Sequence, residues 1–223
     1  MKVVLLHAFP LDERMWDPQR AALEQYDVEA PNLYALGGNT MDAWAASVLA
    51  RLDGAVAAVG ASMGGYVALA MARQAPDRIR GVLLAGSRLT ADSPERREGR
   101  AATIELIRGE GPKGLWENQR DKLFGEHAPA EAVERAEQMT LDREIPELVR
   151  AIEAIRDRSD GSAVLDQTRV LLAVGAGDEF FPPEEAADVP AELAIFERSR
   201  HLPNLEQPDE FNRTLNEFLQ ALR

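Results

Sequence analysis

Residues 60–65, with the sequence Gly-Ala-Ser-Met-Gly-Gly, constrain the fold of this chain more than any other stretch. The preceding residues 55–59 are small and apolar and suit one buried strand, whereas residues 66–73 have a helical pattern. A serine at this junction, with small residues around it, predicts a sharp strand-to-helix turn with no room for larger side chains. Such a turn, called a nucleophile elbow, would lift the Ser62 hydroxyl clear of the sheet. The alternative is an ordinary glycine-rich turn without chemistry.

Composition narrows the class of protein and its partners. The 223 residues, 45% of them apolar, are enough for one large core, and the net charge of −13 argues against nucleic acid or an anionic membrane as a partner. There is no cysteine, so disulfides and thiolate sites are excluded. No stretch reaches the roughly 18 apolar residues of a membrane span, and residues 3–6 are too short for a signal-peptide core. We expect a cytoplasmic protein without cofactor or metal, and leave open whether it is a monomer or a homo-oligomer.

Short apolar runs alternate with amphipathic segments along most of the chain. This alternation predicts an α/β fold: a mostly parallel sheet of about six strands with helices on both faces. The expected strands are residues 2–6, 27–30, 55–59, 81–85, 170–174 and 193–196. The helices expected between and after them include residues 12–26, a helix capped by Thr40, a helix opened by Pro146, and residues 211–222.

The alternation stops between residues 88 and 144, where the sequence is charged, helical in pattern and interrupted by glycine and proline. We therefore predict a small helical lid, residues 88–144, inserted into a core made of residues 1–87 and 145–223. Trp116, Leu123 and Phe124 are candidates for the walls of a substrate pocket. Packing of the lid against the core is the alternative role for these three residues.

A serine hydroxyl needs a neighbouring base to become a nucleophile, and the chain has only three histidines. His201 lies between the last predicted strand and the last helix, at the carboxyl edge where α/β sheets place their chemistry. His127 lies in the charged insertion and is expected to be solvated. His7 precedes the first loop, which suits a structural role. The sequence thus favours His201 as the base.

A third group must hold the base, and Asp178 follows the predicted strand 170–174 directly, through Gly-Ala-Gly. It too would lie at the carboxyl end of a strand. Glu179 is a competitor because it is adjacent. The local pattern favours Asp178, since a strand is followed by Gly-x-x-Asp and then by a proline at position 182. The order Ser62, Asp178, His201 is also that of the α/β-hydrolase triad.

The sequence resembles the α/β-hydrolase superfamily along essentially its whole length. Four blocks carry the resemblance: His-Ala-Phe-Pro at 7–10, the elbow at 60–65, the loop of Asp178, and His-Leu-Pro-Asn-Leu-Glu-Gln-Pro at 201–208. The resemblance implies that Ser62 is the nucleophile, that His201 is general base and then acid, and that Asp178 orients His201. It also implies an oxyanion hole formed by the backbone amides of Phe9 and Met63.

Three features depart from the family pattern. Ala8 stands where the family usually has glycine, although alanine is small enough that we expect the oxyanion hole to survive. Arg200 precedes the base in place of a common glycine, so it would either lower the pKa of His201 or bind an acidic substrate. The chain also begins almost directly on the strand before the first loop, so we expect two strands of the full fold to be absent.

The resemblance implies a serine hydrolase that cleaves a small carboxylic ester, thioester or lactone through an acyl-enzyme. The short lid and the His-Ala-Phe-Pro block are similar to those of bacterial esterases and enol-lactonases. The same triad also serves cofactor-free haloperoxidases, perhydrolases and carbon–carbon bond hydrolases, which are the alternatives. A non-catalytic binding module on this fold is a further one.

Overall fold

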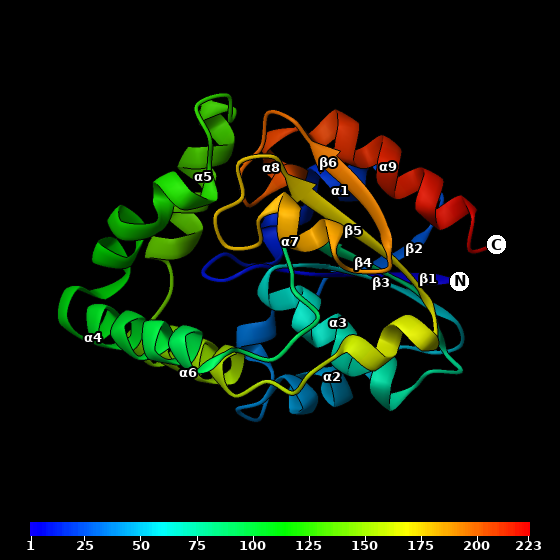
Figure 1. Ribbon diagram of the computed structural model, residues 1–223, viewed down its shortest axis with the longest axis horizontal. Coiled ribbons are helices and arrows are strands. Elements are labelled where there is room, and N and C mark those ends of the chain that lie inside the picture. Colours follow the sequence, from blue (N-terminus) through cyan, green and yellow to red (C-terminus); the bar gives the residue numbers. More distant parts are fainter.

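In the computed structural model, which describes residues 1–223, six strands form one sheet in the order β2-β1-β3-β4-β5-β6 (Figure 1). All five pairings between neighbouring strands are parallel. The strands are β1 (Lys2–Leu6), β2 (Asp27–Glu29), β3 (Val56–Ala61), β4 (Ile79–Ala85), β5 (Arg169–Gly175) and β6 (Glu192–Phe196). The predicted six-stranded parallel sheet is confirmed, and its strand boundaries differ from the prediction by no more than two residues.

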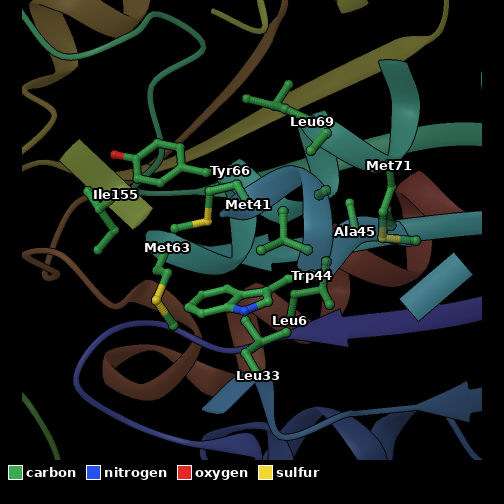
Figure 2. Packing of buried hydrophobic residues seen from close by; sticks show 14 of the residues in the cluster. Leu6, Leu33, Met41, Trp44, Ala45, Met63, Tyr66, Leu69, Met71 and Ile155 are labelled. Atoms are coloured by element: carbon green, nitrogen blue, oxygen red, sulfur yellow. The ribbon is translucent and has the colours of Figure 1, made fainter. Parts of the chain in front are cut away.

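Side chains alternate along each strand, so apolar residues project from both faces of the sheet. Helices cover both of these faces. Val4 and Leu6 of β1 belong to one large apolar cluster, which includes side chains of α2 (Met41–Leu49) and α3 (Met63–Gln74). Val3 and Leu5 belong to a second cluster on the opposite face, with α9 (Pro208–Gln220). Figure 2 shows part of the first cluster, in which the Met63 side chain lies beside Trp44. With both faces buried, polar chemistry is left to the ends of the strands.

The N-terminal helical region differs from the prediction of one helix over residues 12–26. It divides into a 3₁₀ turn, η1 (Glu13–Trp16), and the short helix α1 (Asp17–Ala22). Asp12 caps the turn by accepting the N–H of Arg14 at 3.1 Å, and β2 begins at Asp27, which leaves no room for a longer helix. In contrast, the predicted cap of α2 is confirmed, since Thr40 Oγ1 accepts the N–H of Ala43 at 3.1 Å.

The segment between β4 and β5 is helical, as predicted for residues 88–144. Its helices α4 (Pro94–Leu123) and α5 (Ala130–Leu141), green in Figure 1, project to one side of the sheet, and α6 (Ile145–Arg156) follows them. Gly111, with a φ of 69°, and Pro112 break α4 into two helical parts. The remaining short elements are η2 (Leu33–Ala35), η3 (Ser162–Asp166), α7 (Pro183–Ala187) and α8 (Pro203–Glu206). None of the helices is long and apolar enough to cross a membrane.

Candidate active site

Ser62 sits between β3 and α3 in a strained backbone conformation. Its φ of 47° and ψ of −110° make it the one non-glycine residue with positive φ. Strain of this kind costs about 1–3 kcal/mol and persists only where the surroundings enforce it. Here the Ser62 N–H donates to the Ala85 carbonyl of β4 at 2.8 Å, and the Ser87 hydroxyl donates to the Ser62 carbonyl at 2.9 Å. The turn therefore has the sharp geometry that its sequence predicts.

The glycines of this turn are required by close backbone approach. A Cβ at Gly64 would lie 2.0 Å from the carbonyl oxygen of Leu6 in β1. A Cβ at Gly60 would lie 2.4 Å from the carbonyl oxygen of Gly64. Neither position can hold a side chain unless the backbone moves, which explains why the sequence has glycine at both.

His201 and Asp178 form a buried pair at the carboxyl edge of the sheet. His201 Nδ1 lies 2.9 Å from Asp178 Oδ2 and 3.0 Å from Oδ1. Asp178 Oδ1 also accepts the N–H groups of Phe180 at 2.8 Å and Phe181 at 3.0 Å, which fixes the carboxylate. The competing Glu179 is exposed and pairs with Arg200 at 3.2 Å. The structure thus brings Asp178, and not Glu179, to the histidine.

The pairing with Asp178 determines which nitrogen of His201 is available to a substrate. An ionised carboxylate only accepts hydrogen bonds, so Nδ1 carries the proton and Nε2 is left as the basic nitrogen. Ser62 and His201 line the same cavity, without a hydrogen bond between their side chains. Hydrogen bonds of this type often form only once a substrate is bound.

The backbone amides of Phe9 and Met63 have no acceptor within the protein. Phe9 lies in the loop after β1, lines the cavity with Ser62, and its N–H makes no hydrogen bond. Met63 is the first residue of α3, so its N–H has no partner in the helix. At the preceding Ala8, the N–H is turned to Met15 Sδ at 3.1 Å. Two free donors therefore flank the serine from different elements.

The cavity beside Ser62 is narrow, with a volume of about 30 Å³. It is lined by Phe9, Ser62, Tyr66, Gly86, Arg88, Arg100, Gln119, Leu123, Ile155, Phe180 and His201. Of the three pocket-wall candidates from the helical segment, only Leu123 is among them. Trp116 and Phe124 instead pack edge to face, 6.2 Å apart, in the apolar cluster that contains α9. Trp116 and Phe124 therefore have the alternative role of packing, whereas Leu123 belongs to the same cluster and also lines the cavity.

The other two histidines have unrelated environments. His7 is fully buried; its Nε2 accepts the N–H of Leu33 at 2.9 Å and its Nδ1 lies 3.1 Å from the Ala8 carbonyl. Burial lowers the pKa of His7 to about 4, so its imidazole is neutral and holds the loop in place. His127 is exposed beside Glu126. These positions agree with the structural and solvated roles expected from the sequence.

Glu206 is a buried carboxylate whose role the sequence did not indicate. Its Oε1 accepts the N–H groups of Arg200 at 2.9 Å and Leu202 at 3.2 Å, on either side of His201. Its Oε2 accepts the N–H of Gly125 at 2.7 Å, just beyond α4. Burial raises its pKa, with the three backbone donors acting against this shift. The only sequence signal was its place between His201 and Pro208.

Arg200 does not face the cavity. Its guanidinium donates to the Asp121 carbonyl and to Glu179, away from Ser62. The cations that line the cavity are Arg88 and Arg100, from the loop after β4 and from α4. Arg200 is thus not part of the cavity lining, so nothing in its position supports the alternative that it binds an acidic substrate. No group of three or more histidine or carboxylate side chains is arranged to hold a metal ion.

Comparison with known proteins agrees with this fold. Residues 3–214 match the alpha/beta hydrolase family, and the chain belongs to that family. It is similar to a pimeloyl-[acyl-carrier protein] methyl ester esterase of Neisseria meningitidis, with 27% identity over 99% of this chain and 93% of the relative.

Solved structures give the same result. A thermophilic esterase from Thermogutta terrifontis, determined with malate bound, superposes with a TM-score of 0.89 and 32% identity over 100% of this chain and 90% of its own. An enol-lactonase from Burkholderia xenovorans shares the fold, with a TM-score of 0.81 and 23% identity over 98% of this chain and 90% of its own.

Proposed function

We propose that this protein is a serine hydrolase that cleaves a small carboxylic ester, thioester or lactone through an acyl-enzyme. The observation that carries the proposal is the pairing of His201 Nδ1 with the buried Asp178, at a cavity that also contains the strained Ser62. In this proposal His201 Nε2 is the base for the Ser62 hydroxyl, which lines the same cavity. A strained turn and a buried histidine–carboxylate hydrogen bond together serve no evident purpose in stability alone.

In the first half of the reaction, Ser62 Oγ attacks the ester carbonyl carbon while His201 Nε2 accepts the hydroxyl proton. The carbonyl oxygen becomes an oxyanion, for which the amides of Phe9 and Met63 are the free donors. Asp178 accepts the Nδ1–H and stabilises the imidazolium that forms. The intermediate then collapses: the ester C–O bond breaks, His201 returns the proton to the leaving alcohol, and the acyl group stays on Ser62.

The second half repeats these steps with water as the nucleophile. His201 Nε2 takes a proton from water, the hydroxide attacks the acyl carbonyl, and the proton returns to Ser62 as the acid is released. The cavity of about 30 Å³, which has room for two or three water molecules, would hold the reacting ester group rather than the whole substrate. Residues 88–144 serve as the lid in this proposal, because Arg100, Gln119 and Leu123 of α4 complete the cavity wall.

The named relatives support an ester as the substrate class. One relative is named for a methyl ester, and the esterase from Thermogutta terrifontis binds malate, a dicarboxylate. We therefore propose methyl esters and carboxylate-bearing esters, besides 4-nitrophenyl esters and small lactones, as the substrates to test first.

The decisive variant is Ser62→Ala, assayed on this panel of esters and lactones. We expect kcat to fall by a factor on the order of 10⁴–10⁶, because the nucleophile is lost. Ser47→Ala is the matched control, since the Ser47 hydroxyl caps a carbonyl within α2, away from the cavity. Undiminished turnover by Ser62→Ala would contradict the mechanism.

A second measurement does not depend on the choice of substrate. A fluorophosphonate reagent should label Ser62 in the wild type, and intact-mass and peptide analysis would locate the adduct. Labelling should be lost in Ser62→Ala and strongly slowed in His201→Ala, because the latter removes the base. Equal labelling of His201→Ala and the wild type would exclude His201 as the activating base.

A further inference from the structure

Two guanidinium groups line the cavity that contains Ser62 and His201, although the whole chain carries a net charge of −13. Arg88 lies in the loop after β4 and is largely buried, and Arg100 lies on α4 with 22% of its side chain exposed. Keeping two cations beside a reaction centre is costly unless anions neutralise them. The charges around them therefore decide what the cavity can accept.

Arg88 shares its carboxylate with a second arginine. Its Nε and Nη2 both donate to Glu185 at 2.7 Å, as a bidentate pair. Arg96 Nη2 also reaches Glu185, at 3.2 Å. Two guanidinium groups thus depend on one carboxylate, and Arg88 Nη1 donates no hydrogen bond within the protein.

Arg100 likewise shares one carboxylate, that of Asp92, with a second arginine. Its Nε donates to Asp92 Oδ2 at 3.1 Å, while the fully buried Asp92 also pairs with Arg158 at 2.7 Å. Arg158 is held in place by the carbonyls of Thr90 and Ile155 and is unavailable to a ligand. The two terminal nitrogens of Arg100 have no acceptor in the protein. Positive charge is therefore in excess here as well.

An open cleft of about 530 Å³ adjoins the cavity and shares Arg88 and Arg100 with it. The cleft adds Arg96 and Lys122, so it holds four basic side chains, against only two acidic ones. Of the acidic pair, Glu185 is occupied by Arg88 and Arg96, and Glu179 pairs with Arg200. The route to Ser62 is consequently basic on an acidic protein, which raises the local concentration of anions.

We propose that the cleft selects esters that bear a free carboxylate. Arg100 is the main group that binds this carboxylate, and Arg88 lies beside it. This inference rests on the proposed hydrolase function and names its substrate class. The free terminal nitrogens of Arg100 match the two oxygens of a carboxylate, which guanidinium groups bind in a bidentate manner. Arg100 is a specificity-determining residue here, since it binds the part of the substrate that does not react.

The carboxylate can belong to the acyl part or to the alcohol part of the ester, and two matched pairs of substrates distinguish these sources. Monomethyl adipate against methyl hexanoate tests the acyl side, and 4-acetoxybutanoate against butyl acetate tests the alcohol side. The readout is the ratio of kcat/KM for the charged ester to that for its neutral partner, measured by acid release at constant pH. We expect a ratio above about 10 for one pair.

Arg100→Gln should lower that ratio by about 10- to 100-fold, since it removes a charged hydrogen-bond donor. Arg100→Lys keeps the charge without the planar fork and should give an intermediate ratio. Arg108→Gln, which removes an exposed arginine on the same helix that pairs with Glu105, should keep the wild-type ratio. Thermal melting of each variant establishes that it is folded.

Binding without turnover separates failure of this inference from failure of the proposed function. Calorimetry of the better charged ester with Ser62→Ala should show binding that is at least tenfold weaker in Ser62→Ala/Arg100→Gln. Hydrolysis of neutral and charged esters at equal kcat/KM would overturn the carboxylate site and leave the hydrolase intact. If the wild type hydrolysed no ester, the proposed function would fail, and the calorimetry alone would decide whether the anion site exists.

Discussion

The carboxyl edge of the sheet and the helical segment of residues 88–144 meet at one cavity but are built in opposite ways. At the sheet edge, backbone approaches backbone so closely that Gly60 and Gly64 cannot hold a side chain, and the polar groups are buried in fixed pairs. Along α4 the surface is charged, and Gly99 and Gly109 have open space around them. Under the proposed function, backbone packing at the sheet edge fixes the reacting groups, whereas side chains of α4 would contact the rest of the substrate.

The largest contrast should come from two adjacent carboxylates in the loop after β5, of which only Asp178 is paired with His201. Asp178→Asn replaces the acceptor for His201 Nδ1 and should lower kcat by about 10⁴, because the wrong tautomer is favoured. Glu179→Gln removes only an exposed pair with Arg200 and should change kcat by less than about fivefold. Steady-state kinetics on one ester would measure both; similar losses in the two variants would contradict the assignment.

Glycine substitutions test the difference in packing directly. Gly64→Ala places a Cβ 2.0 Å from the Leu6 carbonyl and should cost about 3 kcal/mol of unfolding free energy or more. Gly109→Ala, in an open part of α4, should instead stabilise the protein by about 1 kcal/mol. Urea denaturation gives both values. A Gly64→Ala protein as stable as the wild type would mean that the elbow is not tightly packed.

The pH dependence of the unfolding free energy should differ between the buried His7 and the exposed His127. The folded pKa of His7 is about 4, below that of an unfolded histidine, so between pH 6.5 and 4 only the unfolded chain takes up a proton. The stability due to neutral His7 is complete above pH 6.5 and is lost as pH falls toward 4, by about 3 kcal/mol.

His7→Gln should therefore show a shallower fall in unfolding free energy over this range than the wild type. His127→Gln, at the exposed histidine of the helical segment, should keep the wild-type slope. Urea denaturation at pH 7, 6, 5 and 4 would measure these slopes. If His7→Gln and the wild type lost stability in parallel, the burial of His7 would not be the cause.

The sequence predicted the sheet edge well because its constraints are local. The strand periodicity, the small residues around Ser62 and the glycines before Asp178 each act within a few positions. The basic cleft could not be predicted, since Arg88 meets a partner 97 positions away, and nothing local shows that Glu185 serves two arginines. Arg200 looked significant from its place beside His201, yet its side chain points elsewhere.

Glu206 has a mechanical consequence for substrate entry. The carboxylate that holds the backbone around His201 also holds Gly125, and the His201 N–H itself donates to the Leu123 carbonyl at the end of α4, at 3.3 Å. Opening the cavity at this end of α4 would therefore break hydrogen bonds on the segment that carries the base. The end of α4 and the segment that contains His201 are thus held together by the Glu206 carboxylate and by one backbone hydrogen bond.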